Sequence, residues 1–453
     1  MGNVNQNAGQ AGDPATAYLA RCASGEKGRE LLMCMRSAEH QLLADGYRSR
    51  RRLDRPLFRP RSELASAAAD TASLVTLLYE IRDRCFGGSA EAYLLKQGMP
   101  MDIIREILRG VVDSRIVYAR PDMLSADGRL RIIEVNAGSD LGGLNMSRLN
   151  AALLAQDAFS AFAEEYRMCY VDSLESAANQ LRCVAKDVVG THNPVVALIE
   201  ESGSNAACAD LVRCLRACGL EIFWGELKDL SRVRGKMVLR DSVPVDVVFR
   251  YFFRSHFQDE PDGFSKLDML VDAHRDGRTA LFTGFDHEVY ASKAAIGLLY
   301  EPEVSSMLSA EERALVERRI PWTRRLAPDG LRSDHAALID ECRHRRPDLI
   351  VKPALGSDSD GVIFGKQLTD REWTDVLSGP LSRSLIVQER IVPDSEDIMN
   401  PETLEIEPWH VNWGIYVTES GMGGTFVRGR RAVEDGVIGG HGNNTLSGCA
   451  FCY

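Results

Sequence analysis

The sequence predicts a mixed α/β fold of the α+β kind, divided into two or three lobes. Residues 16–110 carry apolar side chains at three- and four-residue spacing, which is typical of helices. Residues 191–285 alternate short apolar strands with a helix, which indicates a small parallel sheet. Residues 286–453 contain further apolar strands separated by turns of small residues. At 453 residues the chain also exceeds one ordinary domain.

Composition and charge exclude several functional classes. Hydrophobic residues make up 45% and charged residues 26%, which is ordinary for a globular protein. The net charge of −11 disfavours nonspecific nucleic-acid binding as the main function. No apolar run approaches the roughly 20 residues that span a bilayer. We therefore expect no nucleic-acid partner and no membrane. The scattered cysteines and the polar N-terminus, described next, favour a cytoplasmic location.

The two ends of the chain carry no strong motif. Residues 1–15 are polar and lack the apolar core of a signal peptide, so we expect a flexible N-terminus. The eleven cysteines are scattered without paired metal spacing. Cys449 and Cys452 form a CxxC pair, but no second pair accompanies them. The sequence leaves their role, and that of the N-terminal helices, undefined.

Helices are expected before and after a predicted hairpin. Ala17–Ala44 and Ser62–Phe86 are the long periodic stretches of the helical N-terminal region, residues 16–110. Residues 111–190 then hold the hairpin, a Gly-rich loop and a helix over Asn145–Tyr170. A Gly-rich loop approaches a ligand closely, although such loops also follow strands for turn reasons alone.

The hairpin around Asp127-Gly128 is the most informative stretch. Gly tolerates positive φ at this turn, so the flanking runs are expected to pair as antiparallel strands. Glu134 and Asn136 are two residues apart on the return strand and therefore share one face. Asp122 precedes Gly128 by the same number of residues as Glu134 follows it. The turn is thus expected to set the two carboxylates near each other.

This polar face has two interpretations. Two carboxylates, one amide oxygen and Arg120 directed at one spot form a hard-oxygen metal site. Mg²⁺ prefers such ligands, with phosphates and water in the remaining positions. The alternative is an amphipathic hairpin whose polar face meets water. The spacing alone leaves both interpretations open.

Residues 191–285 are expected to form a small α/β domain. Its predicted strands are Pro194–Ile199, Leu220–Trp224, Met237–Leu239 and Val245–Phe252. No GxGxxG motif follows the first strand, so the dinucleotide fingerprint is absent. Arg250 and Arg254 lie near the carboxyl end of a strand, where α/β sheets bind ligands. Structural ion pairs are an equally good explanation of these two arginines.

Two lysines lie where a lysine is unexpected. Ser292 is expected to cap a helix with Lys293 in its first turn, where the helix dipole disfavours a cation unless an anion or solvent is near. Lys352 stands inside the apolar strand 349–353, where an unpaired ammonium group is costly to bury. The loop 354–361 follows, and its backbone N–H groups suit phosphates. Together these features predict a nucleotide clamp that is not a Walker A loop.

The order of these motifs resembles the ATP-grasp superfamily. More narrowly, it resembles the circularly permuted members typified by the synthetase domain of glutathionylspermidine synthase. In ordinary ATP-grasp enzymes the Lys-Pro strand comes first, whereas here Glu134-Val-Asn136 precedes Lys352-Pro353. The resemblance covers most of residues 110–453. It implies a pre-ATP-grasp-like domain at 191–285 and a nucleotide-binding domain at 286–453.

The resemblance also implies a role for each site residue. Lys293 and Lys352 would bind the phosphates of ATP, while Arg120 and Arg428 would stabilise the transferred phosphoryl group. The implied ligands of Mg²⁺, or of Mn²⁺ in its place, are Asp122, Glu134 and Asn136. The remaining implied nucleotide contacts are Gly356, Ser357 and Gly361 in the loop. Gln388, Glu389 and Ile391 belong to a segment similar to the hinge that holds adenine and ribose.

The implied activity is an ATP-dependent carboxylate–amine ligase of peptide or natural-product biosynthesis. ATP would convert a small-molecule or peptide carboxylate into an acylphosphate, which an amine then attacks, with release of ADP. One alternative is an ATP-grasp phosphotransferase, which would need a phosphorylatable histidine. His410 and His441 are the candidates in the last part of the chain. The other alternative is an inactive nucleotide-binding scaffold, against which the intact Asp/Glu/Asn set argues. The sequence names neither substrate, and it leaves a homodimer open.

Overall fold

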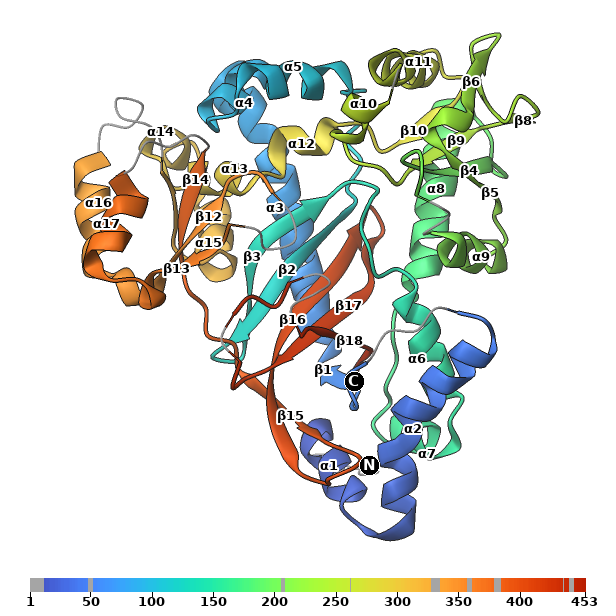
Figure 1. The fold of residues 1–453 in the computed structure, drawn as a ribbon, viewed down its shortest axis with the longest axis vertical. Coiled ribbons are helices and arrows are strands. Elements are labelled where there is room, and N and C mark those ends of the chain that lie inside the picture. Colours follow the sequence, from blue (N-terminus) through green and yellow to red (C-terminus); the bar gives the residue numbers. More distant parts are fainter. Residues whose placement is uncertain are drawn as a thin grey trace, which may run out of the picture.

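The computed structural model gives a mixed α/β fold built around a central antiparallel sheet (Figure 1). The structure describes residues 12–47, 52–204, 208–260, 262–326, 335–356, 361–378, 384–434, 436–439 and 444–453. The central sheet has six strands in the order β18-β17-β16-β2-β3, with β15 added to β16. Its strands are β2 Ala119–Ala126, β3 Arg129–Ala137, β15 Ser395–Met399, β16 Ile406–Thr418, β17 Gly421–Arg431 and β18 Leu446–Gly448. It therefore joins the early hairpin to strands from the end of the chain.

The predicted hairpin is confirmed. Asp127 and Gly128 have φ values of 51° and 70°, as a two-residue turn of type I′ requires. Asp394 accepts hydrogen bonds from both turn amides, each at 3.1 Å, and from Ser125 Oγ at 2.6 Å. These bonds fix the turn against the segment that enters β15.

Helix α3 Arg61–Phe86 packs against β16 and β17 of the central sheet. The predicted helix over Ser62–Phe86 is thereby confirmed. By length and composition alone, α3 is the one described helix that could cross a membrane. Leu74 and Leu78 on α3 are completely buried, which is the usual state of a core helix in a globular protein. The apolar face of α3 is thus packed inside the protein.

The other N-terminal helices differ from the prediction in their number. The predicted helix Ala17–Ala44 is two helices, α1 Pro14–Cys22 and α2 Gly25–Ala44, because Gly25 adopts a φ of 63° that a continuous helix does not allow. The predicted helix Asn145–Tyr170 is likewise divided. The remaining helices of this half are α4 Ala90–Lys96, α5 Met101–Arg109, α6 Met146–Leu154, α7 Asp157–Glu165 and α8 Ser173–Val189.

A parallel sheet forms the lobe at the upper right of Figure 1. Its strand order is β10-β9-β4-β5. The strands are β4 Val195–Glu200, β5 Glu221–Glu226, β9 Val247–Arg250 and β10 Ala280–Phe282, and helices α9 Ala209–Ala217, α10 His256–Asp259 and α11 Gly263–Arg275 accompany them. The predicted strand–helix–strand alternation is confirmed here.

One predicted strand of this lobe belongs elsewhere. Met237–Leu239 lies in β7 Lys236–Leu239, which pairs antiparallel with β6 Leu230–Val233 and β8 Val243–Pro244 in a separate sheet. Arg234 and Gly235 have φ values of 50° and 85°, so they form a tight hairpin turn that keeps β7 beside β6. Because the short turn pairs β7 with β6, β7 does not join the parallel sheet as predicted.

A third sheet and its helices form the lobe at the left of Figure 1. The strand order is β11-β14-β12-β13, and every pair is antiparallel. The strands are β11 Thr323–Leu326, β12 Leu349–Pro353, β13 Ile363–Phe364 and β14 Leu385–Glu389. The helices from Asp286 onward are α12 Asp286–Tyr290, α13 Lys293–Leu298, α14 Pro302–Ser305, α15 Ala310–Arg319, α16 His335–His344 and α17 Asp370–Ser378.

A short strand from the N-terminal half of the chain pairs in parallel with the last strand. β1 Leu57–Arg59 pairs with β19 Ala450–Cys452.

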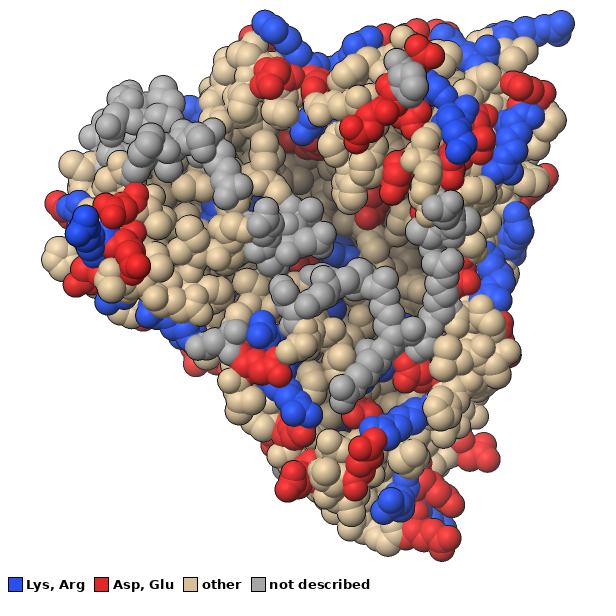
Figure 2. Space-filling view, viewed as in Figure 1, with Lys and Arg blue, Asp and Glu red and all other residues tan. Residues whose placement is uncertain are grey.

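On the face seen in Figure 2, Lys and Arg side chains are interspersed with Asp and Glu. Such mixing of signs is typical of a solvated surface, so the net negative charge does not by itself mark a binding site.

Candidate active site

The hairpin places the two predicted carboxylates directly opposite each other. Asp122 on β2 pairs with Glu134 on β3. The next pair joins Met123 to Ile132, so Ile133 is left without a partner and forms a β-bulge. Bulges interrupt the ladder and redirect neighbouring side chains, and they are common beside functional sites. This one lies immediately next to Glu134.

Lys293 reaches the hairpin from the first turn of α13. Ser292 caps this helix by accepting a hydrogen bond from the Ala295 amide at 3.0 Å, as predicted. Lys293 is only 9% exposed. Its Nζ lies 3.3 Å from Glu134 Oε2 and donates to the Gly356 carbonyl at 2.9 Å. A carboxylate therefore offsets the unfavourable position of this cation in the helix.

Lys352 reaches the same strand from β12. It is 5% exposed, and its Nζ donates to Gln388 Oε1 at 2.8 Å and to the Ile133 carbonyl at 3.4 Å. Gln388 in turn donates to Thr323 Oγ1 at 3.0 Å. Burial lowers the pKa of Lys352 to about 8, against the opposing effect of Glu134. Two lysines distant in sequence thus converge on β3.

Asp122 is held by two arginines and one amide. Arg428 on β17 lies 2.7 Å from Asp122 Oδ2, and Arg120 lies 3.9 Å from Oδ1. Asn412 on β16 donates to Oδ2 at 3.1 Å. Burial alone would raise the pKa of Asp122, but Arg428 and Arg120 outweigh it and hold the pKa below its usual value. Asp122 is therefore a fixed carboxylate anion.

The two predicted catalytic arginines share one aromatic ring. The guanidinium groups of Arg120 and Arg428 each lie 5.2 Å from the centre of the Phe426 ring. Arg120 also donates to the Gly142 carbonyl in the Gly-rich loop, and it faces Asn136 across the hairpin. The cation–π contacts and this hydrogen bond fix both charges beside Asp122.

The predicted phosphate loop is described only in part. The Gly356 carbonyl accepts from Lys293, and Gly356 has a φ of 136°. Gly361 has a φ of 71°, which is a conformation that favours glycine. Ser357 lies outside the described residues. Two glycines with positive φ therefore bound the loop.

The predicted adenine and ribose contacts lie at the end of β14 and just beyond it. The side chain of Gln388 is completely buried and bonded to Lys352, so it supports the lysine. Glu389 is half-buried at the end of β14, and its carboxylate accepts from the Trp322 amide at 3.3 Å. Ile391 is half-buried just beyond the strand. Gln388 thus has a defined role in the described site, whereas the adenine role of all three stays a prediction.

The donor set fits a divalent cation such as Mg²⁺. Asp122 Oδ1 is buried and accepts no hydrogen bond, and the same holds for Asn412 Oδ1. Glu134 remains 25% exposed through its side chain. Among the described residues, no group of three or more His, Cys, Asp or Glu forms a complete metal site. Mg²⁺ typically takes one or two carboxylates and completes its shell with phosphates and water, which this pair of carboxylates suits.

Arg250 and Arg254 are structural rather than free to bind a ligand. Arg250 is 1% exposed and pairs with Asp140 at 3.0 Å. Arg254 pairs with Glu106 and, at 3.1 Å, with Glu288. Of the two explanations that the sequence left open, ion pairing is the one these contacts support.

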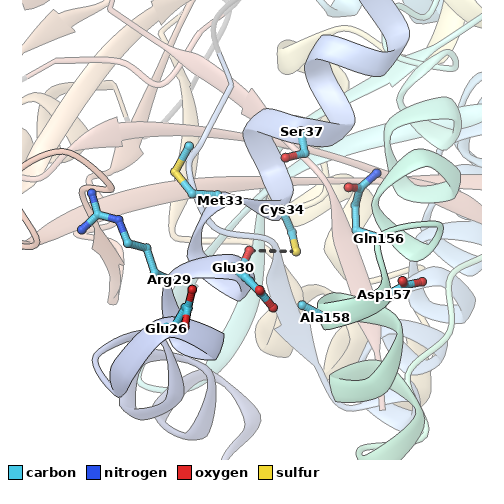
Figure 3. A pocket seen from close by; sticks show the side chains of 9 residues that line it. All are labelled: Glu26, Arg29, Glu30, Met33, Cys34, Ser37, Gln156, Asp157 and Ala158. Atoms are coloured by element: carbon cyan, nitrogen blue, oxygen red, sulfur yellow. Dashed lines mark hydrogen bonds between the residues drawn. The ribbon is translucent and has the colours of Figure 1, made fainter.

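A surface groove of about 460 Å³ lies between α2 and α7 (Figure 3). Its lining residues are Glu26, Arg29, Glu30, Met33, Cys34, Ser37, Gln156, Asp157 and Ala158. None of the predicted site residues lines this groove. The hydrogen bond from Cys34 Sγ to the Glu30 carbonyl is internal to α2. We therefore assign no catalytic role to this groove.

Sequence reasoning missed Asn412, Thr323 and Tyr416. Asn412 bonds to Asp122, Thr323 bonds to Gln388, and Tyr416 donates to the same Gly142 carbonyl as Arg120. A polar amide between Val411 and Trp413, at the start of an apolar run, was a usable signal, because a buried amide needs partners. Thr323 and Tyr416 carried no such signal.

Comparisons with known proteins support the fold. No family model and no curated protein matches the sequence. Among solved structures, the chain is similar to a glutathione synthetase-like effector from Globodera pallida in its apo form. The TM-score is 0.57, with 13% identity over 93% of this chain and 97% of that one. The permuted segment order stays a prediction. The chain thus has a mixed α/β fold shared with a glutathione synthetase-like protein.

Proposed function

We propose that this protein is an ATP-dependent carboxylate–amine ligase of the ATP-grasp kind, releasing ADP and phosphate. The observation that carries the proposal is the convergence of Lys293 and Lys352 on β3, beside Glu134. These two nearly buried ammonium groups share the single carboxylate of Glu134, so an anionic ligand would offset their remaining charge. The fold shared with a glutathione synthetase-like protein supports the same activity class.

The charge balance of the site supports a polyphosphate ligand. Four cationic side chains surround two carboxylates, which leaves an excess of positive charge. The cations are Arg120, Lys293, Lys352 and Arg428, and the carboxylates are Asp122 and Glu134. ATP with bound Mg²⁺ carries net negative charge and would neutralise that excess, so its phosphates fit better than a neutral or cationic ligand.

The proposed chemistry asks mainly for positioning and charge neutralisation. A carboxylate is a poor acyl donor because oxide is a poor leaving group. Transfer of the γ-phosphoryl group gives an acylphosphate, and attack by an amine then expels phosphate. Lys293 and Lys352 would hold the phosphates, while Arg120 and Arg428 would stabilise the moving charge. Mg²⁺, held by Asp122, Glu134 and Asn136, would supply charge neutralisation between phosphates.

An activity screen tests this proposal. Purified protein with ATP and Mg²⁺ is incubated with pools of amino acids, dipeptides and amines, and ADP is measured. Hydroxylamine in place of the amine should trap the acylphosphate as a hydroxamate. AMP and pyrophosphate would instead show adenylation, and phosphohistidine would show the phosphotransferase. ATP binding without turnover in every pool would favour the scaffold.

Binding is tested separately by calorimetry with ATP. K293A and K352A should each weaken ATP affinity at least about tenfold, since each removes a charge from the phosphate site. K236A is the matched control, because Lys236 is an ion-paired lysine in the separate antiparallel sheet, 2.5 Å from Asp246. Unchanged affinity in both site variants would remove the nucleotide site.

A further inference from the structure

Cys169 and Cys452 form a thiol pair that the activity proposed above does not use. Their Sγ atoms lie 3.2 Å apart, and both cysteines are free. The two residues also exchange both backbone hydrogen bonds, at 2.8 and 2.7 Å, as an isolated antiparallel bridge. Residues paired in this way have Cα atoms about 5.5 Å apart, which lies within the span of a disulfide. A bond between them therefore needs no backbone movement.

The two thiols differ in environment. Cys452 is 3% exposed, and burial raises its pKa to about 11. Cys169 is half-buried, and the exposed Arg61 donates a hydrogen bond to its sulfur at 2.8 Å. Arg61 also acts on Cys452, where its charge opposes the rise in pKa caused by burial, so exposure is what distinguishes the two thiols. Cys169 is thus the group placed to react first, with Cys452 directly behind it.

We propose that Cys169 and Cys452 are a reversible oxidation site for hydroperoxides. The Cys169 thiolate attacks one peroxide oxygen, the O–O bond breaks, and with one proton a water (or alcohol) leaves, giving sulfenic acid. Cys452 sulfur then attacks Cys169 sulfur, the S–O bond breaks, and the Cys452 proton leaves with hydroxide as water. Both sulfurs lose one electron, and the peroxide gains the two.

The site differs from the CxxC pair that the sequence contains. Cys449 is buried, and its sulfur lies 3.5 Å from Met35 Sδ. Cys452 instead meets a residue 283 positions earlier in the chain. A disulfide there would tie β19, and with it β1, to the segment that enters α8. Because such a bond closes a very long loop in the unfolded chain, oxidation should stabilise the protein.

Peptide mapping tests the site directly. The full chain is treated with one equivalent of hydrogen peroxide, its free thiols are alkylated, and it is digested without reduction. We expect loss of two of the eleven thiols and a peptide joining Cys169 to Cys452, reversed by dithiothreitol. The melting temperature of the oxidised form should rise by roughly 5 °C. A bond between Cys449 and Cys452, or none, would overturn the proposal.

Variants assign the two roles. C452S should stop at a sulfenic acid on Cys169, which dimedone captures, and R61A should slow oxidation at least about threefold because the attacking sulfur loses its cationic neighbour. C449S is the matched control and should form the disulfide as the wild type does. Peroxide that oxidises the exposed Cys183 before Cys169 would refute the proposed reactivity. None of these readouts requires ligase activity.

Discussion

Asp122 and Arg428 form an ion pair across an intervening strand, with Arg428 Nη2 2.7 Å from Asp122 Oδ2. They belong to β2 and β17, and β16 lies between these strands with Asn412 opposite Arg428. The pair occupies one oxygen of Asp122 and leaves the buried Oδ1 without a hydrogen bond. Arg428 therefore has two separable roles, one in holding Asp122 and one in the proposed reaction.

R428A should lower the free energy of unfolding by about 3 kcal/mol, because it leaves a largely buried carboxylate without its main partner. Urea denaturation of the ligand-free protein measures this loss. R431A is the matched control on the same strand, since Arg431 is 40% exposed through its side chain and pairs with Glu407 at 3.1 Å. Exposed pairs contribute at most about 1 kcal/mol. If R428A and R431A lower the free energy of unfolding equally, the Asp122–Arg428 pair contributes no more to stability than an exposed pair.

ATP affinity should fall as the pH rises through about 8, the pKa to which burial lowers Lys352. Only the protonated lysine attracts phosphate, and the protonated fraction falls above that pH. The dissociation constant should therefore rise by up to about tenfold for each pH unit above 8. Calorimetry between pH 6.5 and 9.5 measures the profile. K352R should flatten it, because arginine stays charged; the same slope in K352R would assign the titration to another group.

Local sequence signals predicted the hairpin and the cap of α13 well. Asp127-Gly128 permits positive φ at two successive residues, and that property sets Asp122 opposite Glu134. Ser292 before Lys293 gives a helix start because its side chain accepts a backbone hydrogen bond. Such features depend on neighbours in the chain, so a single sequence is enough to find them.

Long-range pairings could not be predicted in the same way. The partnership of Asp122 with Arg428 depends on β16 lying between β2 and β17, which no local pattern specifies. The CxxC spacing sets Cys449 near Cys452 in the sequence and gives no sign of Cys169, which the backbone brings to Cys452. The predicted first helix was wrong for a different, local reason. Its apolar periodicity continues across Gly25, whereas the positive φ of this residue separates the two helices.

E134Q should lower turnover at least about a hundredfold, equivalent to roughly 2.7 kcal/mol of transition-state stabilisation. It removes the charge that faces both the proposed metal and Lys293, while shape is kept. Stability should fall by only about 1 kcal/mol, since Glu134 is 25% exposed through its side chain and its pair with Lys293 spans 3.3 Å. ADP release at limiting Mg²⁺ and thermal denaturation measure the two effects.

E396Q is the control for that change. Glu396 is an ion-paired carboxylate on β15 of the same sheet, 2.6 Å from Arg55, and none of its contacts reaches the lysines. Its loss should leave turnover within about twofold of wild type. If E134Q also retains near-normal turnover, Glu134 is not a metal ligand.

N412L should separate positioning from packing. Asn412 Nδ2 donates to Asp122 at 3.1 Å and to the Ile438 carbonyl at 3.3 Å, so leucine leaves both acceptors short of a donor. We expect a stability loss of about 1–2 kcal/mol. Turnover should fall at least about tenfold, with a higher Mg²⁺ requirement, because residues that orient a metal ligand typically contribute 10–100-fold.

N150L supplies the comparison that decides the role of Asn412. Asn150 is a buried amide on α6 that donates to the Ala450 carbonyl at 2.9 Å, with no contact to Asp122. Its substitution should cost a similar 1–2 kcal/mol of stability, because a buried acceptor again loses its donor. Turnover and Mg²⁺ dependence should nevertheless stay at the wild-type level. Equal losses of turnover in N412L and N150L would mean that Asn412 acts only through stability, whereas a loss confined to N412L would make it a positioning residue for Asp122.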